Sequence, residues 1–125
     1  MTFSFLLGSA TNADFHSDGR VSPIFSGWWG EPKNIFRGNG VVTSINNIAK
    51  NFFSTGFVTD NLAVYSLRIG EGKTPAKVRY LSKDRGQSYR TWLGEIAEVI
   101  VINKRLTDAE ITEINQHLMT KYGIQ

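Results

Sequence analysis

The clearest hydrophobic pattern in the chain is an apolar run near the C-terminus, followed by a helical pattern. Residues 96–102 are apolar except for Glu98 and mostly β-branched, which predicts a strand buried on both faces. After a polar turn, Thr107 and Glu110 have the spacing of a capping box, so a helix is expected to begin there. Gly123 is its expected end. The stripe expected to face the core is Ile111, Ile114, Leu118 and Tyr122, with Leu106 and Ile111 placed as a hydrophobic staple.

Shorter patterns upstream predict further strands separated by turn-rich loops. In residues 62–69 the alternation predicts two faces. One carries Leu62, Val64, Ser66 and Arg68, and the other carries Ala63, Tyr65, Leu67 and Ile69. Residues 46–56 fit either a helical turn or a loop wrapped over the body. The other strands are expected at residues 2–8, 21–25, 34–37, 41–45 and 77–81, with turns at 38–40 and 70–73. Many short apolar runs and twelve glycines favour an all-β body in one domain, residues 1–125.

The strand, turn and helix resemble the C-terminal signature of the concanavalin A-like, laminin-G-like jelly-roll family of bacterial and phage proteins. The matching residues are 94–105, 106–110 and 121–124, which carry the Gly-Glu-Ile-Ala-Glu start, the Leu-Thr-x-x-Glu helix start and the Lys-Tyr-Gly-Ile end. Residues 5–8 with 14–16, and 84–85 before Trp92, resemble earlier parts of the family pattern. The resemblance implies an all-β jelly-roll sandwich with one short C-terminal helix, whose first strands are lacking or supplied by another chain.

Composition narrows the classes of function. The 125 residues include no cysteine, which excludes disulfides and thiolate metal sites. No run approaches the ~20 apolar residues of a membrane span. Residues 3–10 are apolar but short, with no preceding Lys or Arg, so no signal peptide is expected. The net charge of +3 does not indicate nucleic-acid binding.

Two loops contain candidate ligand-binding residues. Trp28 and Trp29 lie between glycines, where they can form a platform for a sugar ring, a contact with a protein partner, or part of the core. Asp14, His16 and Asp18 share one side of an extended segment and form a candidate calcium site. The alternative is an Asx-rich loop whose side chains bind their own backbone.

A basic stretch spans residues 68–90 and includes Arg79 and Arg85. This stretch can bind an anionic polymer or an acidic neighbouring protein, or it can be the solvated face of a hairpin. Glu95 and Glu98 are two carboxylates close together in the sequence, as a catalytic pair would be. Side chains three apart on a regular strand point to opposite faces, so these two carboxylates cannot flank one bond. Glu98 is instead expected to be structural, paired with a base or with backbone amides.

The sequence therefore predicts a non-catalytic protein without a required cofactor. The first hypothesis is a structural subunit of a phage particle (a decoration, tail or fibre component) that contacts other proteins or copies of itself. The alternative is a lectin-like module at the cell surface or outside the cell. It would recognise a surface polysaccharide, with calcium as a candidate ligand of its loop.

Overall fold

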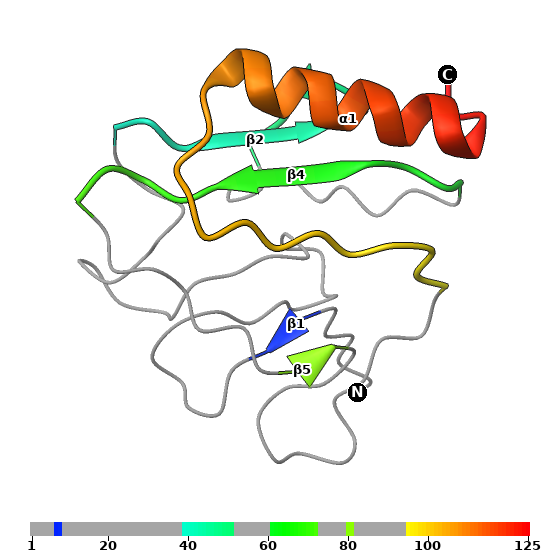
Figure 1. Cartoon of the computed structure of the whole chain (residues 1–125), viewed down its shortest axis with the longest axis horizontal. Coiled ribbons are helices and arrows are strands. Elements are labelled where there is room, and N and C mark those ends of the chain that lie inside the picture. The colour runs from blue at the N-terminus through cyan, green and yellow to red at the C-terminus, as the bar shows by residue number, and fades with distance from the viewer. Residues whose placement is uncertain (1–6, 9–38, 52–60, 73–79, 82–94) are drawn as a thin grey trace.

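The computed structural model describes residues 7–8, 39–51, 61–72, 80–81 and 95–125. These ranges contain short strands in two antiparallel sheets and one C-terminal helix (Figure 1). The first sheet pairs β1 with β5, and the second has the order β3-β2-β4. The elements are β1 (Leu7–Gly8), β2 (Val42–Ile45), β3 (Ile48–Ala49), β4 (Tyr65–Arg68), β5 (Tyr80–Leu81) and α1 (Asp108–Tyr122). This part of the chain is therefore mixed, with a small antiparallel sheet and a helix.

The strands predicted at 2–8, 41–45, 62–69 and 77–81 are each confirmed over a shorter span. The expected strands at 21–25 and 34–37 lie outside the described residues. The turns at 39–40 and 71–72 are confirmed, and Gly40 and Gly72 both adopt positive φ angles there.

The central strand β2 is joined to β3 by a two-residue hairpin. Asn46 and Asn47 have φ angles of 49° and 64°, which asparagine tolerates better than most residues and which two-residue hairpins favour. The Asn46 backbone N–H donates to the Val64 carbonyl (2.9 Å). The Val64 N–H in turn donates to Asn46 Oδ1 (2.8 Å). The prediction of a helical turn or wrapped loop is thus wrong for residues 46–49, because this Asn pair permits a tight reversal.

Helix α1 begins and ends where the sequence predicts. The Glu110 N–H donates to Thr107 Oγ1 (3.2 Å), and the Thr107 N–H donates to Glu110 Oε2 (2.7 Å). These are the two reciprocal bonds of a capping box. Gly123 adopts a left-handed conformation with φ 64°, and the Ile124 N–H donates to the Met119 carbonyl (2.8 Å). Both ends of the helix therefore have backbone groups satisfied by local partners.

The buried stripe of α1 differs from the prediction. Ile111, Asn115 and Met119 are buried, whereas the other expected core residues, Ile114, Leu118 and Tyr122, are only half-buried. The helix is turned so that a polar residue faces the sheet. Asn115 Nδ2 donates to Asn47 Oδ1 (2.9 Å), Ser66 Oγ (3.1 Å) and Ser44 Oγ (3.3 Å).

The face of β4 that meets α1 agrees with the predicted alternation. Val64, just before β4, is buried, and Ser66 contacts the helix through Asn115. Arg68 contacts the first residue of the helix, Asp108 (2.7 Å). The buried apolar residues of the described part are Val64, Ile111 and Met119, so its core lies between this sheet and the helix.

Residues 96–102 do not form the predicted strand. They run as an extended trace beneath β4 in the view of Figure 1, from yellow to orange, and then lead into α1. Val99, Ile100, Val101 and Ile102 are 41%, 47%, 68% and 42% exposed. The prediction of a strand buried on both faces is wrong here, because no described strand pairs with this segment. Within the described ranges, no helix is both long and apolar enough to span a membrane.

Candidate functional site

The sequence-predicted site residues lie outside the described part of the chain. They are Trp28, Trp29, Arg79, Arg85, Asp14, His16 and Asp18. Within the described ranges, no group of three His, Asp or Glu residues is placed to hold a metal ion. The candidate site is therefore built from the sheet, the helix and residues 95–105.

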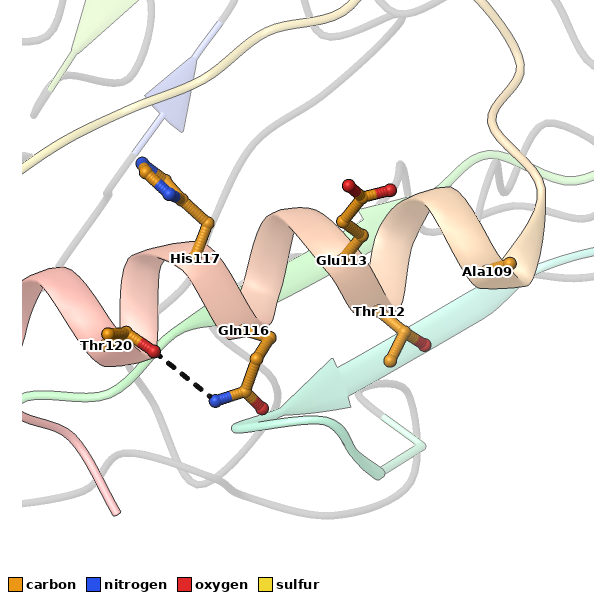
Figure 2. Close-up of a pocket in the computed structure, with 6 residues that line it drawn as sticks. All are labelled: Ala109, Thr112, Glu113, Gln116, His117 and Thr120. Atoms are coloured by element: carbon orange, nitrogen blue, oxygen red, sulfur yellow. Dashed lines mark hydrogen bonds between the residues drawn. The ribbon is translucent and has the colours of Figure 1, made fainter.

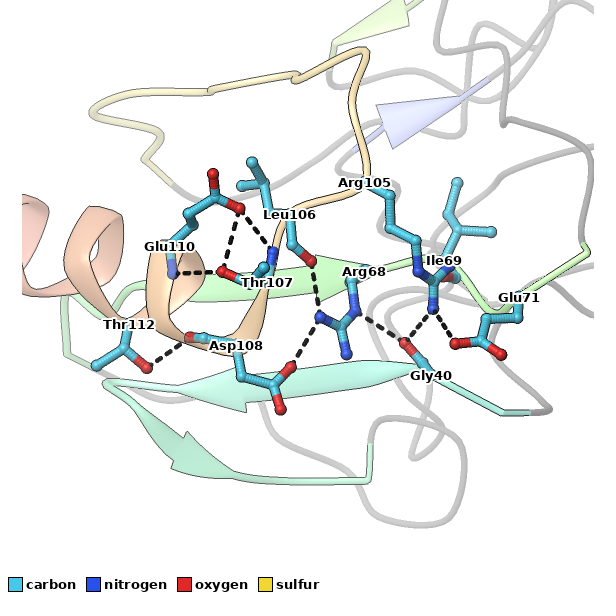
Figure 3. A network of polar contacts seen from close by, with 10 residues as sticks. All are labelled: Gly40, Arg68, Ile69, Glu71, Arg105, Leu106, Thr107, Asp108, Glu110 and Thr112. Atoms are coloured by element: carbon cyan, nitrogen blue, oxygen red, sulfur yellow. Dashed lines mark hydrogen bonds and ion pairs between the residues drawn. The ribbon is translucent and has the colours of Figure 1, made fainter.

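Two arginines meet at one carbonyl oxygen (Figure 3). Arg68 Nε (2.8 Å) and Arg105 Nη2 (3.0 Å) both donate to the Gly40 carbonyl. Gly40 has a φ of 71°, and a Cβ added there would clash with the Arg105 guanidinium, so this close approach requires glycine. Arg105 Nη1 also donates to the Ile69 carbonyl (2.9 Å). The turn before β2, the end of β4 and residue 105 are thereby held together.

Arg68 connects the same network to the start of α1. Its Nη1 donates to the Leu106 carbonyl (2.7 Å) and contacts Asp108 Oδ1 (2.7 Å). The Arg68 side chain is only 15% exposed, so it is a structural residue rather than part of a free basic face. We call the contacts of Arg68 and Arg105 the arginine anchor, because they fix the C-terminal end of residues 95–105.

Glu98 anchors the other half of this segment to the end of α1. Its Oε2 accepts hydrogen bonds from Lys121 Nζ and from the Tyr122 hydroxyl, each at 2.8 Å. The bond from Lys121, followed by that from Tyr122, lowers the pKa of Glu98. The same contacts with Glu98 raise the pKa of Lys121 and of Tyr122. The expectation that Glu98 is paired with a base is confirmed, and the carboxylate is ionised at neutral pH.

Between these two anchors lies a stretch of four exposed apolar residues, 99–102, which we call the apolar segment. None of the backbone hydrogen bonds between described residues involves residues 96–104. Extended backbone that the described strands do not use can serve as a template for another strand. Contiguous exposed apolar side chains mark interaction sites. The apolar segment is therefore a candidate interaction surface, held at both ends by the protein's own contacts.

A second feature is a hollow of about 610 Å³ along the outward face of α1. Its described lining residues are Ala109, Thr112, Glu113, Gln116, His117 and Thr120. Figure 2 shows the side chains of Glu113 and His117 on one side of the helix, while Thr112 and Gln116 lie on the other. Ligand sites have polar groups that converge on one point. The described side chains diverge, so by themselves they do not form such a site.

Comparisons of the chain with protein-family models, with curated proteins and with solved structures found no match. A function for this chain is therefore inferred from the contacts described above. Sequence reasoning finds the residues of the apolar segment but places them in the interior. It misses the arginine anchor, since nothing local in the sequence indicates that Gly40 and Arg105 meet.

Proposed function

We propose that this protein is a non-catalytic structural subunit of a larger assembly, with a phage particle as the leading setting. The observation that carries the proposal is the apolar segment, whose side chains are 41% to 68% exposed. Exposing such a segment without a partner costs solubility. Burying it against another chain releases apolar surface from water, which is the main favourable term in protein association.

The ionisable groups near the segment favour a structural role. Glu98 and Glu110 both have lowered pKa values and accept hydrogen bonds from lysines. A general acid at neutral pH needs a raised carboxyl pKa, because it must carry a proton to give. These two carboxylates hold the segment and the helix start in place instead.

The architecture of the whole domain is part of the same proposal. The strand-turn-helix resemblance in residues 94–124 favours a jelly-roll sandwich of the concanavalin A-like type. Residues 96–102 are extended backbone outside the described sheets. Such a segment is a place where another chain can add a strand.

Sedimentation velocity of the full chain over a range of concentrations tests this function. We expect the wild-type chain to associate and Val101→Lys to remain monomeric, because a charge in the centre of the apolar segment opposes its burial. The matched control is Ile48→Lys, which adds the same charge at another exposed apolar residue, 71% exposed, in β3. This control is expected to associate like the wild type.

A chain that stays monomeric at every concentration and binds a polysaccharide would contradict the proposal. It would favour the lectin-like alternative, in which Trp28 and Trp29 are the candidate platform. Association that survives Val101→Lys but is lost in Ile48→Lys would also contradict it, because the interface would then lie at β3.

A further inference from the structure

Asn39 and Gly40 form the turn before β2, and they are the only place in the sequence where a glycine follows an asparagine. Asparagine is a thermolabile residue, because the backbone nitrogen of the next residue can attack its side-chain amide carbon. A side chain on that next residue hinders the attack, and glycine has none. Asn39 is exposed, so water reaches its amide. The turn therefore has the composition and the exposure that deamidation requires.

No described residue bonds to the side chain of Asn39 or to the N–H of Gly40. The asparagines of the β2–β3 hairpin differ in this respect. Asn46 Oδ1 accepts a hydrogen bond from a backbone N–H (2.8 Å), and Asn47 Oδ1 accepts one from Asn115 Nδ2 (2.9 Å). A residue with a side chain also follows each of these two asparagines. Asn39 is thus the asparagine of these three whose amide is left open to attack.

The polar groups around the turn favour the first step, in which the Gly40 N–H loses its proton. The negative charge then passes to the Asn39 carbonyl oxygen, which accepts a hydrogen bond from the Glu71 N–H (2.7 Å). A hydrogen bond to the charged form of a group stabilises that form. Arg68 and Arg105 both donate to the next carbonyl, that of Gly40, and their positive charges act in the same direction. The Glu71 carboxylate opposes this effect, but it is itself paired with Arg105 (3.5 Å).

We infer that Asn39 deamidates spontaneously through a succinimide with Gly40, and that the isoaspartate formed there loosens the arginine anchor. The Gly40 nitrogen, after losing its proton, bonds to Asn39 Cγ. The Cγ–Nδ2 bond breaks, and the side-chain nitrogen takes up a proton and leaves as ammonia. Water then opens the ring, either at Cγ to give aspartate or at the main-chain carbonyl to give isoaspartate. The inference concerns this turn and does not depend on the assembly role.

Isoaspartate at position 39 alters the anchor because the main chain then runs through Cβ and is longer by one carbon. The Glu71 N–H is bonded to the Asn39 carbonyl, and the two arginines are bonded to the Gly40 carbonyl. The added carbon changes the spacing of these two carbonyl groups, so the two sets of bonds cannot both keep their geometry. The anchor also maintains the reactive sequence. The close approach of Arg105 requires glycine at position 40, and this glycine exposes Asn39 to attack.

Incubation of the folded full chain in mildly alkaline buffer tests the reaction. We expect peptide mass spectrometry to show a loss of ammonia at Asn39, followed by replacement of the amide by an acid. Methylation by isoaspartyl methyltransferase detects the isoaspartate. Tryptic cleavage after Arg37 and Lys50 leaves Asn39, Asn46 and Asn47 in one peptide, so fragment ions are needed to assign the site. Asn46 and Asn47 are expected to stay intact.

The matched control is Asn39→Gln, which keeps an exposed amide but adds a methylene group, so the ring that must close is larger and forms slowly. This variant should show no ammonia loss at position 39. Equal modification of Asn39 and Asn46 in the wild-type chain overturns the assignment of the site. A folded chain that stays unmodified while the urea-denatured chain is modified also overturns the inference, because the fold would then shield the turn.

The effect on the arginine anchor is measured on the isoaspartate form after chromatographic separation. We expect its midpoint of urea unfolding to lie below that of the fresh chain. The control is Asn39→Asp, which adds the negative charge without lengthening the main chain and should unfold like the fresh chain. Equal midpoints for the isoaspartate form and Asn39→Asp overturn the link between this modification and the anchor.

Discussion

At the scale of single residues, Asn115 shows what a periodicity argument misses. The apolar spacing selects Ile114 for the buried stripe, yet Asn115 is only 3% exposed. The reason lies on the sheet, where Ser44, Ser66 and Asn47 present oxygens to the helix. These partners are 49 to 71 residues away in sequence, so no local pattern reveals them. A hydrogen-bonded polar contact thus decides which side of α1 is buried.

We predict that Asn115→Leu lowers the free energy of unfolding by about 2 kcal/mol. The substitution removes a buried donor and leaves sheet oxygens without it, and such losses cost about 1–3 kcal/mol. Chemical denaturation measures the change. The control is Gln116→Leu at the neighbouring exposed position, expected within about 0.5 kcal/mol of the wild type. Equal losses in the two variants would contradict a specific role for the buried amide.

Glu110 makes the stability of the helix start depend on pH. The bond from Lys104, followed by those from Thr107, lowers its pKa from the ordinary 4.5 to about 2. A carboxyl group whose pKa is lowered in the folded state stabilises the fold at pH values above its pKa in the unfolded state. That stability is lost as the pH falls from about 4.5 towards 2.

We therefore predict that the free energy of unfolding falls over this pH window and that the slope is smaller in Glu110→Gln. The glutamine keeps the length of the side chain and does not titrate. Identical pH profiles for the two proteins would show that the capping carboxylate contributes nothing to the acid sensitivity. Thermal melts followed by circular dichroism at several pH values provide the measurement.

At the scale of elements, the sequence predicts α1 well and residues 96–102 poorly, for one physical reason. The caps of α1 are bonds between residues three to five apart, such as Thr107 with Glu110, so their signal is local. A strand forms only when a second strand supplies hydrogen-bond partners for its backbone. The β-branched composition of a segment shows only that the segment would tolerate the strand conformation. The hairpin at Asn46 and Asn47 does have a local signal, because both residues accept positive φ angles. The apolar residues that follow the pair obscure this signal in the sequence.

For the helix as an element, we predict that Thr107→Ala lowers the free energy of unfolding by about 1 kcal/mol, the usual value of an N-cap. The Glu110 N–H loses its partner, the Thr107 hydroxyl. Thr120→Ala, at an exposed position in the last turn, makes the same chemical change away from the cap. A loss in Thr120→Ala as large as that in Thr107→Ala would contradict the assignment of the cap.

At the scale of the whole molecule, the sequence predicts an all-β jelly-roll, and the described residues show a small antiparallel sheet covered by a helix. The helix at the C-terminus and its antiparallel neighbours agree with the prediction, while the sandwich itself stays a proposal. The tryptophan, cation and basic-face candidates, at Trp28, Asp14 and Arg79 among others, lie outside the described part. The sequence does not predict that the apolar segment is exposed, because exposure depends on which strands lie beside it.

The apolar segment also bears on how the protein is made. Val-Ile-Val-Ile, residues 99–102, combines high β-propensity with no charge and no proline, the composition that stacks into cross-β aggregates. Glu98 on one side and Lys104 and Arg105 on the other are gatekeeper residues, whose charges oppose such stacking. These flanking charges therefore protect a newly synthesised chain while the segment is exposed. Under the proposed assembly role, synthesis in excess of the partner, or neutralisation of the flanking charges, favours aggregation over assembly.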